Sequence, residues 1–470
     1  MINKGEIDIV MYDCSKEFIK FYQNHVVLPA EQQNHLRKKR KLNINRLKKG
    51  LEEYNEERGT NLKIAEERIQ GSMAMHTIVQ NDSNDFDIDV GIVFEAENLD
   101  DQGAKSTRKM VKNALERKTN TFADEPEVKT SCVRLKYSEG YHVDFAVFKR
   151  YKENEWDDNF TYEHAGAEWS VRDIKAVEEW FSQKVKEKGT KLRQLVRLSK
   201  MFCKSRDTWG TMPSGLIQTV ICEELFDDGH ERIDETFYYT MKNIVHRLSY
   251  NLEVKAPVDN SRLLTSRKID SELVERWKTK LESCLKKLDI LFNDDCTYKK
   301  AVTAWHEFFN HSYWEDTQNS SLNELLFAKS SSDYDNTEQF IEDLYPEINE
   351  KYYVNIDCKV TGKGFSVIPI TKYLEEIAPR FNKFIPSKFE VRCEIKETNC
   401  PSYDKILWKV KNVGNEAKKR NCIRGQIEER GKSITEPTSF SGPHYIECYL
   451  IKDNVCVAID HIDVPIGGDH

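Results

Sequence analysis

Residues 85–94 read Asp-Phe-Asp-Ile-Asp-Val-Gly-Ile-Val-Phe, and the pair Gly71-Ser72 precedes them in the chain. Side chains alternate between the two faces of a β-strand, so Asp87 and Asp89 project from one face while the apolar residues between them are buried on the other. Two neighbouring carboxylates repel each other unless a cation lies between them, and a divalent metal with oxygen ligands is the usual solution. This pattern therefore predicts a strand with a metal-binding face.

A third carboxylate lies in residues 141–148, which read Tyr-His-Val-Asp-Phe-Ala-Val-Phe and alternate as a second strand. Asp144 is the lone acid there, and an isolated charge in an apolar strand needs a partner. Gly71 and Ser72 offer a small residue, a hydroxyl and backbone amides that can approach a phosphate closely. For the first two acids, a solvated face of an edge strand is the alternative.

A Gly-Ser pair, an Asp-x-Asp strand and a later strand with a third Asp resemble the pattern of the DNA polymerase beta-like nucleotidyltransferases. The surrounding sequence suits that context. Residues 8–57 are mostly helical in pattern, residues 106–118 form a charged helix, and residues 128–137 alternate as a strand before Asp144. This order predicts a small mixed sheet with helices on one face.

The composition predicts a soluble, globular, cytoplasmic chain of two or three domains. The net charge of -8 does not favour indiscriminate binding to long nucleic acid, which depends on a basic surface. Residues 37–41 form a basic run, which we interpret as a solvated helix face; the alternative is a surface for nucleic acid or another polyanionic activator. We find no apolar segment long enough for a bilayer and no signal region in residues 1–15, so we expect no membrane partner.

The 12 cysteines form no C-x-x-C pair, so neither a zinc ribbon nor a disulfide framework is evident. We interpret those near the C-terminal end as buried, reduced thiols in β-structure, and we expect no structural zinc. These residues are Cys393, Cys400, Cys422, Cys448 and Cys456.

Residues 173–330 show mostly helical periodicity, and two polar residues stand out from the apolar stripes. Lys200 lies on a helix over residues 192–206, and Ser214 follows Pro213 as an N-cap residue before an apolar helix. A lysine and a serine at a helix N-terminus are suited to bind a triphosphate, through charge, hydroxyl and helix dipole. The alternatives are a surface lysine and an ordinary N-cap.

Residues 192–200 and 212–215, taken with Gly71-Ser72 and the three aspartates, resemble the CD-NTase family. These proteins are bacterial relatives of cyclic GMP-AMP synthase and oligoadenylate synthase. The resemblance covers roughly residues 40–300 and implies a nucleotidyltransferase lobe followed by a helical lobe. Where many members have a glycine and a threonine, this chain has His76 and Thr77, so we do not count His76 among the catalytic residues.

From residue 388 onward, short alternating segments with glycine and proline between them predict a β-sandwich. Residues 408–417, 424–425 and 441–449 resemble the adenylyl/guanylyl-cyclase and SMODS C-terminal sensor (AGS-C) domain. The resemblance implies a regulatory or ligand-sensing module. Four residues could line a pocket or, alternatively, pack and set turns: Trp408, Arg424, His444 and Tyr445.

We therefore predict an α+β chain, with a polymerase beta-like nucleotidyltransferase lobe and a helical lobe, followed by a small C-terminal β-sandwich-like domain. A polar, turn-rich boundary is expected at residues 329–336. The expected divisions are 1–165 for the N-terminal helices and catalytic lobe, 166–330 for the helical lobe, 331–386 for a linker region and 387–470 for the sensor-like domain.

The resemblance implies a bacterial anti-phage (CBASS) enzyme that joins nucleoside triphosphates, ATP among them, into a cyclic oligonucleotide second messenger. In this interpretation the catalytic and metal-binding residues are Asp87, Asp89 and Asp144, which bind two Mg²⁺ ions or Mn²⁺. The triphosphate is bound by Gly71, Ser72, Lys200 and Ser214.

The same interpretation implies an effector protein that reads the product and an activating ligand at the C-terminal domain, whereas activation by DNA or RNA is not indicated. Three alternatives stay open: synthesis of linear oligonucleotides, transfer of a nucleotide to a protein or tRNA acceptor, and a non-catalytic binding module. The three acids argue against the last of these.

Overall fold

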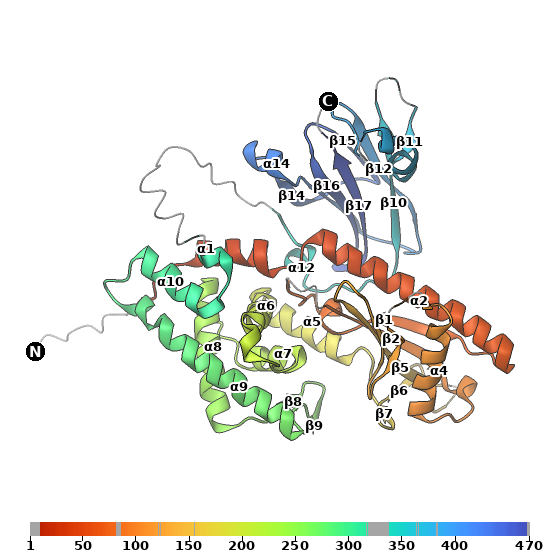
Figure 1. The fold of residues 1–470 in the computed structure, drawn as a ribbon, viewed down its shortest axis with the longest axis horizontal. Coiled ribbons are helices and arrows are strands. Elements are labelled where there is room, and N and C mark those ends of the chain that lie inside the picture. Colours follow the sequence, from red (N-terminus) through yellow and green to blue (C-terminus); the bar gives the residue numbers. More distant parts are fainter. Residues whose placement is uncertain are drawn as a thin grey trace, which may run out of the picture. The chain divides into compact units, whose positions relative to one another are not determined.

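The computed structural model describes residues 10–80, 86–120, 122, 124–154, 156–315, 317, 338–362, 364, 366–381 and 384–467. Asp85 and the expected boundary at 329–336 lie outside these residues. The chain divides into two compact units, Met1–Leu325 and Leu326–His470 (Figure 1). We describe each unit by itself.

The first unit contains a seven-stranded mixed sheet in which β1, β2, β5, β4 and β3 are neighbours in that order, and β6 and β7 extend it from β5. β2 and β5 are parallel, and the other pairs are antiparallel. This confirms the mixed sheet that the sequence predicts. The strands are β1 (Ile64–Ile69), β2 (Asp87–Glu95), β3 (Glu127–Val128), β4 (Val133–Lys136), β5 (His142–Tyr151), β6 (Thr161–Ala165) and β7 (Trp169–Val171).

Two helices, α2 (Ala30–Arg58) and α4 (Ala104–Glu116), cover one face of this sheet (Figure 1). Alternate residues of β2, among them Ile88 and Val90, are fully buried in the core beneath them. The two helices cross closely, because a Cβ on Gly50 would lie 1.9 Å from the carbonyl oxygen of Ala114. The alternating side chains of β2 point to the opposite face, where Asp87 and Asp89 lie at the start of the strand and Val93 is buried further along in a smaller apolar cluster.

The remainder of the first unit is mostly helical after residue 173, as the sequence predicts. Aromatic side chains form much of its core, with Phe18 packed edge-on against Trp305 at 4.5 Å between ring centroids. The elements are α1 (Ser15–Phe21), α3 (Gly71–Ala74), α5 (Ala176–Lys188), α6 (Lys191–Lys204), α7 (Gly215–Glu224), α8 (Ile233–Tyr250), the hairpin of β8 (Lys255–Ala256) and β9 (Asp259–Leu263), α9 (Lys268–Leu285) and α10 (Tyr298–Phe309).

The second unit contains two four-stranded sheets, ordered β11-β10-β12-β15 and β14-β13-β16-β17. Buried residues of both sheets, such as Cys358 and Trp408, belong to one hydrophobic core, which confirms the predicted sandwich. The elements are α12 (Ile341–Leu344), β10 (Val354–Thr361), β11 (Ile368–Pro369), α13 (Ile370–Lys372), β12 (Glu390–Thr398), β13 (Lys405–Lys411), α14 (Asn415–Lys419), β14 (Arg424–Glu429), β15 (Ser433–Pro437), β16 (Gly442–Lys452) and β17 (Val455–Ile466).

The region expected as a linker, residues 331–386, differs from that expectation where it is described. It contributes β10, which pairs with β12 over its whole length, so the sandwich begins well before residue 387. The physical reason is the burial of alternate residues of β10, including Val354 and Val360, in the shared core.

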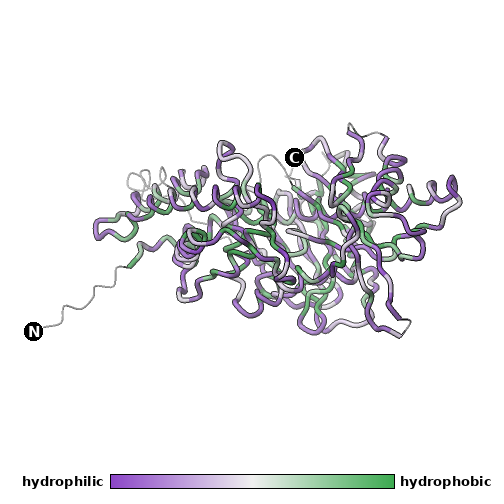
Figure 2. The backbone as a smooth tube through the Cα atoms, turned by 90° about the horizontal axis from the view of Figure 1, so that it is seen from below, coloured by the Kyte–Doolittle hydropathy of each residue, from purple (hydrophilic) through white to green (hydrophobic). Residues whose placement is uncertain are grey.

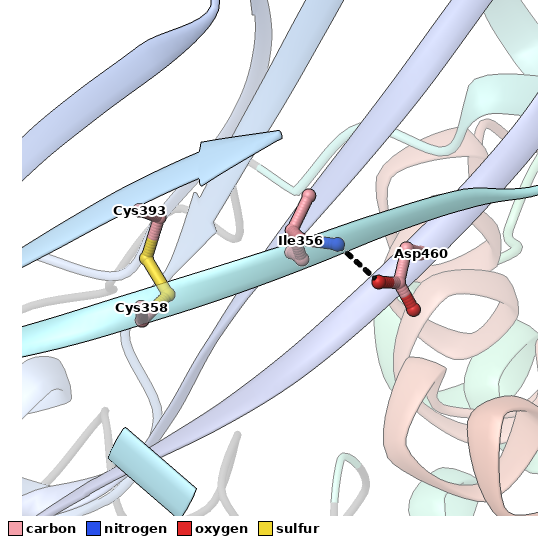
Figure 3. The surroundings of a disulfide bond; sticks show 4 residues. All are labelled: Ile356, Cys358, Cys393 and Asp460. Carbon is pink, nitrogen blue, oxygen red and sulfur yellow. Dashed lines mark hydrogen bonds between the residues drawn. A yellow bond between two sulfur atoms is a disulfide. The ribbon is translucent and has the colours of Figure 1, made fainter. Parts of the chain in front are cut away.

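The prediction of buried, reduced thiols is wrong for two cysteines, Cys393 and Cys422. Cys358 and Cys393 lie directly opposite each other on β10 and β12 and form a disulfide, so Cys393 is not a reduced thiol (Figure 3). The reason is the pairing register, which sets the two Cα atoms 4.0 Å apart and cannot be read from cysteine spacing. Cys422 is a free thiol, but it is exposed rather than buried. The remaining three of the expected set are free and buried as predicted: Cys400, Cys448 and Cys456.

Along the backbone, hydrophobic stretches gather in the interior and hydrophilic stretches at the outer turns (Figure 2). No helix in the described part of the chain combines the length and the apolar character that a bilayer crossing requires.

Candidate active site

The acidic face of the first unit is built from three neighbouring strands. Asp89 on β2 lies directly opposite Asp144 on the parallel strand β5. Asp144 in turn lies opposite Arg134 on the antiparallel strand β4. Asp87 precedes Asp89 by two residues and therefore projects from the same face. The structure thus brings together the three aspartates that the sequence singles out.

Arg134 holds two of these carboxylates with one guanidinium group. Its Nε and Nη2 atoms donate to Asp144 Oδ1 and Oδ2 at 2.7 and 2.6 Å, and Nη2 also donates to Asp87 Oδ1 at 3.1 Å. The hydrogen bonds to Asp144 raise the pKa of Arg134 above its already high ordinary value, so this group is always charged. The sequence analysis does not predict Arg134 as a site residue. Its position in an alternating strand just before the Asp144 strand could have indicated this role.

The third carboxylate, Asp89, has a pKa raised to about 7. Burial is the main cause, and the negative charges of Asp87 and Asp144 add to it. Excess negative charge on oxygen ligands fits a hard divalent cation such as Mg²⁺. Among the described residues, no three His, Cys, Asp or Glu side chains lie close enough to form a metal site as they stand. Arg134 donates to oxygens of Asp87 and Asp144, so the cluster already accepts a cationic group there.

Gly71 packs directly against this cluster. Its φ of 65° is in the left-handed region, and a Cβ there would lie 2.1 Å from Asp89 Oδ2. Only glycine satisfies both conditions. The Gly71 amide donates to Glu178 Oε1 at 3.1 Å, and burial raises the pKa of Glu178, which lies on α5, to about 7. Glu178 is a second site residue that the sequence did not reveal.

Gly71 is the first residue of α3, a single short helical turn, and a loop follows that turn. Ser72 is partly buried in the turn, and its carbonyl oxygen accepts a hydrogen bond from the Thr77 amide at 2.8 Å. This bond folds the loop back so that Thr77 lies beside α6. His76, between them, has a φ of 52°, a left-handed conformation that favours glycine.

Lys200 on α6 reaches this loop from the helical part of the unit. Its Nζ donates to Thr77 Oγ1 at 2.7 Å and to the Thr77 carbonyl at 3.2 Å. Lys200 is buried, so the alternative of a surface lysine is wrong, and burial lowers its pKa to about 7. The negative charge of Asp89 acts on Lys200 as well, so the two residues lie within one electrostatic environment.

Ser214 caps α7, as the sequence predicts. Its Oγ accepts a hydrogen bond from the Ile217 amide at 3.3 Å. A Cβ on Gly215 would lie 3.3 Å from Lys200 Nζ, so the lysine lies next to the N-terminus of this helix. The lysine and the helix start, which are separated in the sequence, therefore form one positively polarised corner.

The four C-terminal residues considered for a pocket do not share one face of the second unit. Trp408 lies in the sandwich core and donates to the Gly431 carbonyl, and His444 is buried and accepts from the Val413 amide. Arg424 pairs with Glu436. The packing alternative holds for these residues, whereas Tyr445, next to His444 along β16, points to the opposite face of the strand.

Comparisons with known proteins agree with this geometry. Residues 65–148, which hold Gly71 and the three aspartates, match the family model of the nucleotidyltransferase domain of DncV-like cyclic GMP-AMP synthases. Residues 335–467 match that of the adenylyl/guanylyl and SMODS C-terminal sensor domain. The second match begins before the described part of the sandwich and includes β10.

A curated relative, a cyclic GMP-AMP synthase of Escherichia albertii, is 24% identical over 417 residues, which cover 85% of this chain and 84% of the relative. Two solved structures of the Vibrio cholerae cyclic AMP-GMP synthase DncV, one with a linear intermediate and one with 3′-deoxy ATP, share the fold. Each has a TM-score of 0.53 and 17% identity and covers 64% of this chain, with 97% and 96% of the respective DncV chains covered. The chain therefore combines a DncV-like nucleotidyltransferase domain with a C-terminal domain of the adenylyl/guanylyl and SMODS sensor type.

Proposed function

We propose that this enzyme joins nucleoside triphosphates into a cyclic oligonucleotide and releases pyrophosphate. The observation that carries the proposal is the position of Asp89 directly opposite Asp144 on parallel strands, with Asp87 on the same face and Gly71 packed against Asp89. Lys200 and the N-terminus of α7 supply the positive side of the same site. Residues 1–165 and 166–330 are proposed as its catalytic and helical lobes.

The proposed metal ligands are Asp87, Asp89 and Asp144. When bound there, two Mg²⁺ ions would supply charge stabilisation at the attacking and leaving oxygens of an in-line phosphoryl transfer. For metal ions to bind there, the hydrogen bonds from Arg134 to the carboxylates of Asp87 and Asp144 have to break. Asp144 takes part in removing the proton from the acceptor hydroxyl, which then forms a new bond to the α-phosphorus as the bond to pyrophosphate breaks.

The triphosphate is proposed to bind between the Gly71–Ser72 turn and the corner formed by Lys200 and Ser214. The Gly71 amide now donates to Glu178, so a phosphate oxygen that takes this amide has to replace the Glu178 carboxylate. Lys200 provides positive charge, and the α7 N-terminus provides the free amides and dipole that favour phosphate. A second round of transfer on the linear intermediate would close the ring.

The named relatives support a cyclic product and make ATP and GTP the first substrates to test. We further propose a cytoplasmic role in CBASS anti-phage defence, with a separate effector protein that reads the product. The sensor domain would hold synthesis low until its ligand binds. We would compare the full chain with a chain that lacks residues 326–470, both before and during phage infection. Equal synthesis by the two chains in both conditions would contradict that regulation.

The test is incubation of the purified chain with each nucleoside triphosphate and with all four, in Mg²⁺ and in Mn²⁺, followed by phosphatase treatment and mass spectrometry. The matched control is the variant Asp87→Asn/Asp89→Asn. We expect a phosphatase-resistant product of two or three nucleotides that the control does not form. A product shortened by phosphatase would indicate linear oligonucleotides instead, and labelling of added protein or tRNA without a free product would indicate nucleotide transfer to an acceptor.

A further inference from the structure

The sheet β14-β13-β16-β17 in the second unit carries charged residues on its outer face. Trp408 on β13 belongs to the sandwich core, so the alternation of side chains turns Lys409 and Lys411 away from that core. Lys409 lies opposite Glu447 on β16, and Glu447 lies opposite His461 on β17. One row of three charged side chains therefore crosses three strands.

A second row lies beside the first. Lys411 on β13 is opposite Tyr445 on β16, and Tyr445 is opposite Asp463 on β17. The His461 ring connects the rows, because Nε2 lies 2.8 Å from Asp463 Oδ1 and the ring stacks on Tyr445 with 4.8 Å between centroids. Both lysines and His461 are buried.

The carboxylate of Glu338 completes this cluster, although Glu338 comes from the segment before α12 and not from the sheet. It accepts from Lys409 Nζ at 2.7 Å, from Lys411 Nζ at 3.1 Å and from the Tyr445 hydroxyl at 2.6 Å. Three donors on two strands thus converge on one carboxylate, whose side chain is only 12% exposed. This is the geometry of an oxyanion site.

The sheet is shaped to receive this segment. Gly425 on β14 has a φ of 101°, and a Cβ there would lie 2.9 Å from the Cα atom of Glu338. The next residue, Gln339, pairs with the strand, because its amide donates to the Gly425 carbonyl at 2.9 Å and its Oε1 accepts from the Ile427 amide at 2.8 Å. Glu338 and Gln339 therefore form a short extended segment along β14, which we call the strap, and this segment positions the Glu338 side chain.

The charge balance of the rows depends on Glu338. Without Glu338, the two rows contain three positive groups, Lys409, Lys411 and His461, and only two carboxylates, Glu447 and Asp463. Burial acts against the charged form of Lys409, yet Glu447 and Glu338 outweigh burial and raise its pKa above the ordinary value.

The rest of the same sheet face is covered by apolar packing, which is the usual way to bury such a face. The apolar residues there are Ile341, Leu407, Tyr449, Ile451 and Cys456. Buried charges are a poor way to stabilise a face that apolar residues can cover. Two buried lysines around one carboxylate are therefore better explained by binding than by a contribution to stability.

We propose that Lys409, Lys411 and Tyr445 form a binding site for an oxyanion, the carboxylate or phosphate group of a small ligand, and that Glu338 occupies it as an internal substitute. The ligand replaces the Glu338 side chain and frees the strap from the lysines. The boundary between the two units falls at residue 325/326, so this exchange takes place close in sequence to where the units are joined. The inference does not depend on the proposed synthase activity.

The test uses the full-length variant Glu338→Ala, which vacates the site. We expect its Tm to fall by roughly 5–15 °C, because the buried lysines lose their counter-charge. Sodium acetate or sodium phosphate should restore most of that loss, whereas sodium chloride at equal ionic strength should not. Rescue by acetate alone indicates a carboxylate ligand, and rescue by phosphate alone indicates a phosphate ligand.

Two variants serve as controls. Glu436→Ala removes a carboxylate that is 15% exposed and bridges two partly exposed arginines, Arg424 and Arg430. It should be destabilised without specific rescue, because its partners do not enclose a site. Glu338→Ala/Lys411→Met lacks a donor of the proposed site, and anions should restore its Tm much less.

If Glu338→Ala does not fold, Glu338→Gln replaces it, because the amide keeps the shape of the side chain and removes its charge. A variant that refolds only with acetate or phosphate present supports the site. Equal anion effects in the Glu338 variant and in both controls, or failure to refold in either anion, would overturn the proposal.

Discussion

Arg134 and Asp144 lie opposite each other on β4 and β5. The guanidinium nitrogens Nε and Nη2 of Arg134 donate to the two carboxylate oxygens of Asp144 at 2.7 and 2.6 Å. The same Nη2 atom reaches Asp87 at 3.1 Å. A guanidinium thus neutralises the carboxylates that we propose as metal ligands. A metal ion and Arg134 therefore compete for the same oxygens.

The variant Arg134→Gln should bind Mn²⁺ more tightly than the parent chain, on the order of tenfold for a lost competing interaction of about 1.4 kcal/mol. Its Tm without metal should fall, because Asp87, Asp89 and Asp144 then repel one another without a counter-charge. Titration with Mn²⁺, followed by electron paramagnetic resonance of the free ion, measures the affinity without any turnover.

Lys136→Gln is the matched control for Arg134→Gln. Lys136 lies two residues further along β4, is exposed and pairs with Glu127 instead of the aspartates. Its removal should leave Mn²⁺ affinity unchanged. An unchanged affinity in Arg134→Gln as well would show that the arginine does not compete with the metal.

Gly71→Ala should abolish product formation and destabilise the chain. The left-handed backbone alone costs roughly 1–2 kcal/mol for a residue with a Cβ, and the new methyl group would overlap the Asp89 carboxylate. Urea unfolding and pyrophosphate release measure the two effects. Gly103→Ala is the control, because Gly103 has a φ of -67° and a Cβ there meets nothing within 4 Å. Parent-like activity in Gly71→Ala would show that the contact with Asp89 is not needed.

Nucleotide affinity should depend on the protonation of Lys200. Burial lowers its pKa to about 7, so the amine is charged below that pH and becomes neutral above it. Binding of a triphosphate requires the charged form and is therefore expected to weaken as pH rises through 7, by up to about tenfold per unit. Calorimetry with a non-hydrolysable ATP analogue between pH 6 and 9 measures this slope.

Lys200→Met should bind the analogue weakly, with a much flatter pH dependence. Lys184→Met, which removes a lysine of α5 that pairs with Glu187, should retain both the affinity and the slope of the parent chain. A slope that persists in Lys200→Met would assign the titration to another group.

The sequence was sufficient for residues whose role depends on local pattern. The alternation around Asp87 and Asp89 predicts which side chains share a face, and Pro213-Ser214 before an apolar helix predicts the N-cap. The lone acid Asp144 in an apolar strand predicts a partner, although not which one. Each of these inferences needs only the periodicity of a strand or the chemistry of a helix start.

Residues that depend on pairing between distant segments were not predictable in the same way. Arg134 becomes a site residue only through the register of β4 against β5, and Glu178 only because α5 begins beside Gly71. The bond between Thr77 and Lys200 also joins two segments that are far apart in the sequence. The disulfide of Cys358 likewise follows from the register of β10 and β12, which a single sequence does not define.

His461 should make the stability of the second unit depend on pH. Burial lowers its pKa, but hydrogen bonds and charge from Asp463 and Glu447 outweigh burial and raise it from 6.5 to about 9. For a base whose folded pKa is raised, the stabilisation is fully present below pH 6.5 and is lost as pH rises through 9. The loss amounts to roughly 3 kcal/mol in the free energy of unfolding. Urea unfolding from pH 6 to pH 10 measures it.

Two variants separate His461 from other groups that titrate in this range. His461→Gln should be less stable at pH 6 and should lose most of the decline between pH 6.5 and 9, because the glutamine has no charge to lose. Asp463→Asn removes one of the two carboxylates that hold the ring and should shift the end of the decline to lower pH, since the pKa of His461 then rises less. A decline of the parent size in His461→Gln would place the titrating group elsewhere in the unit.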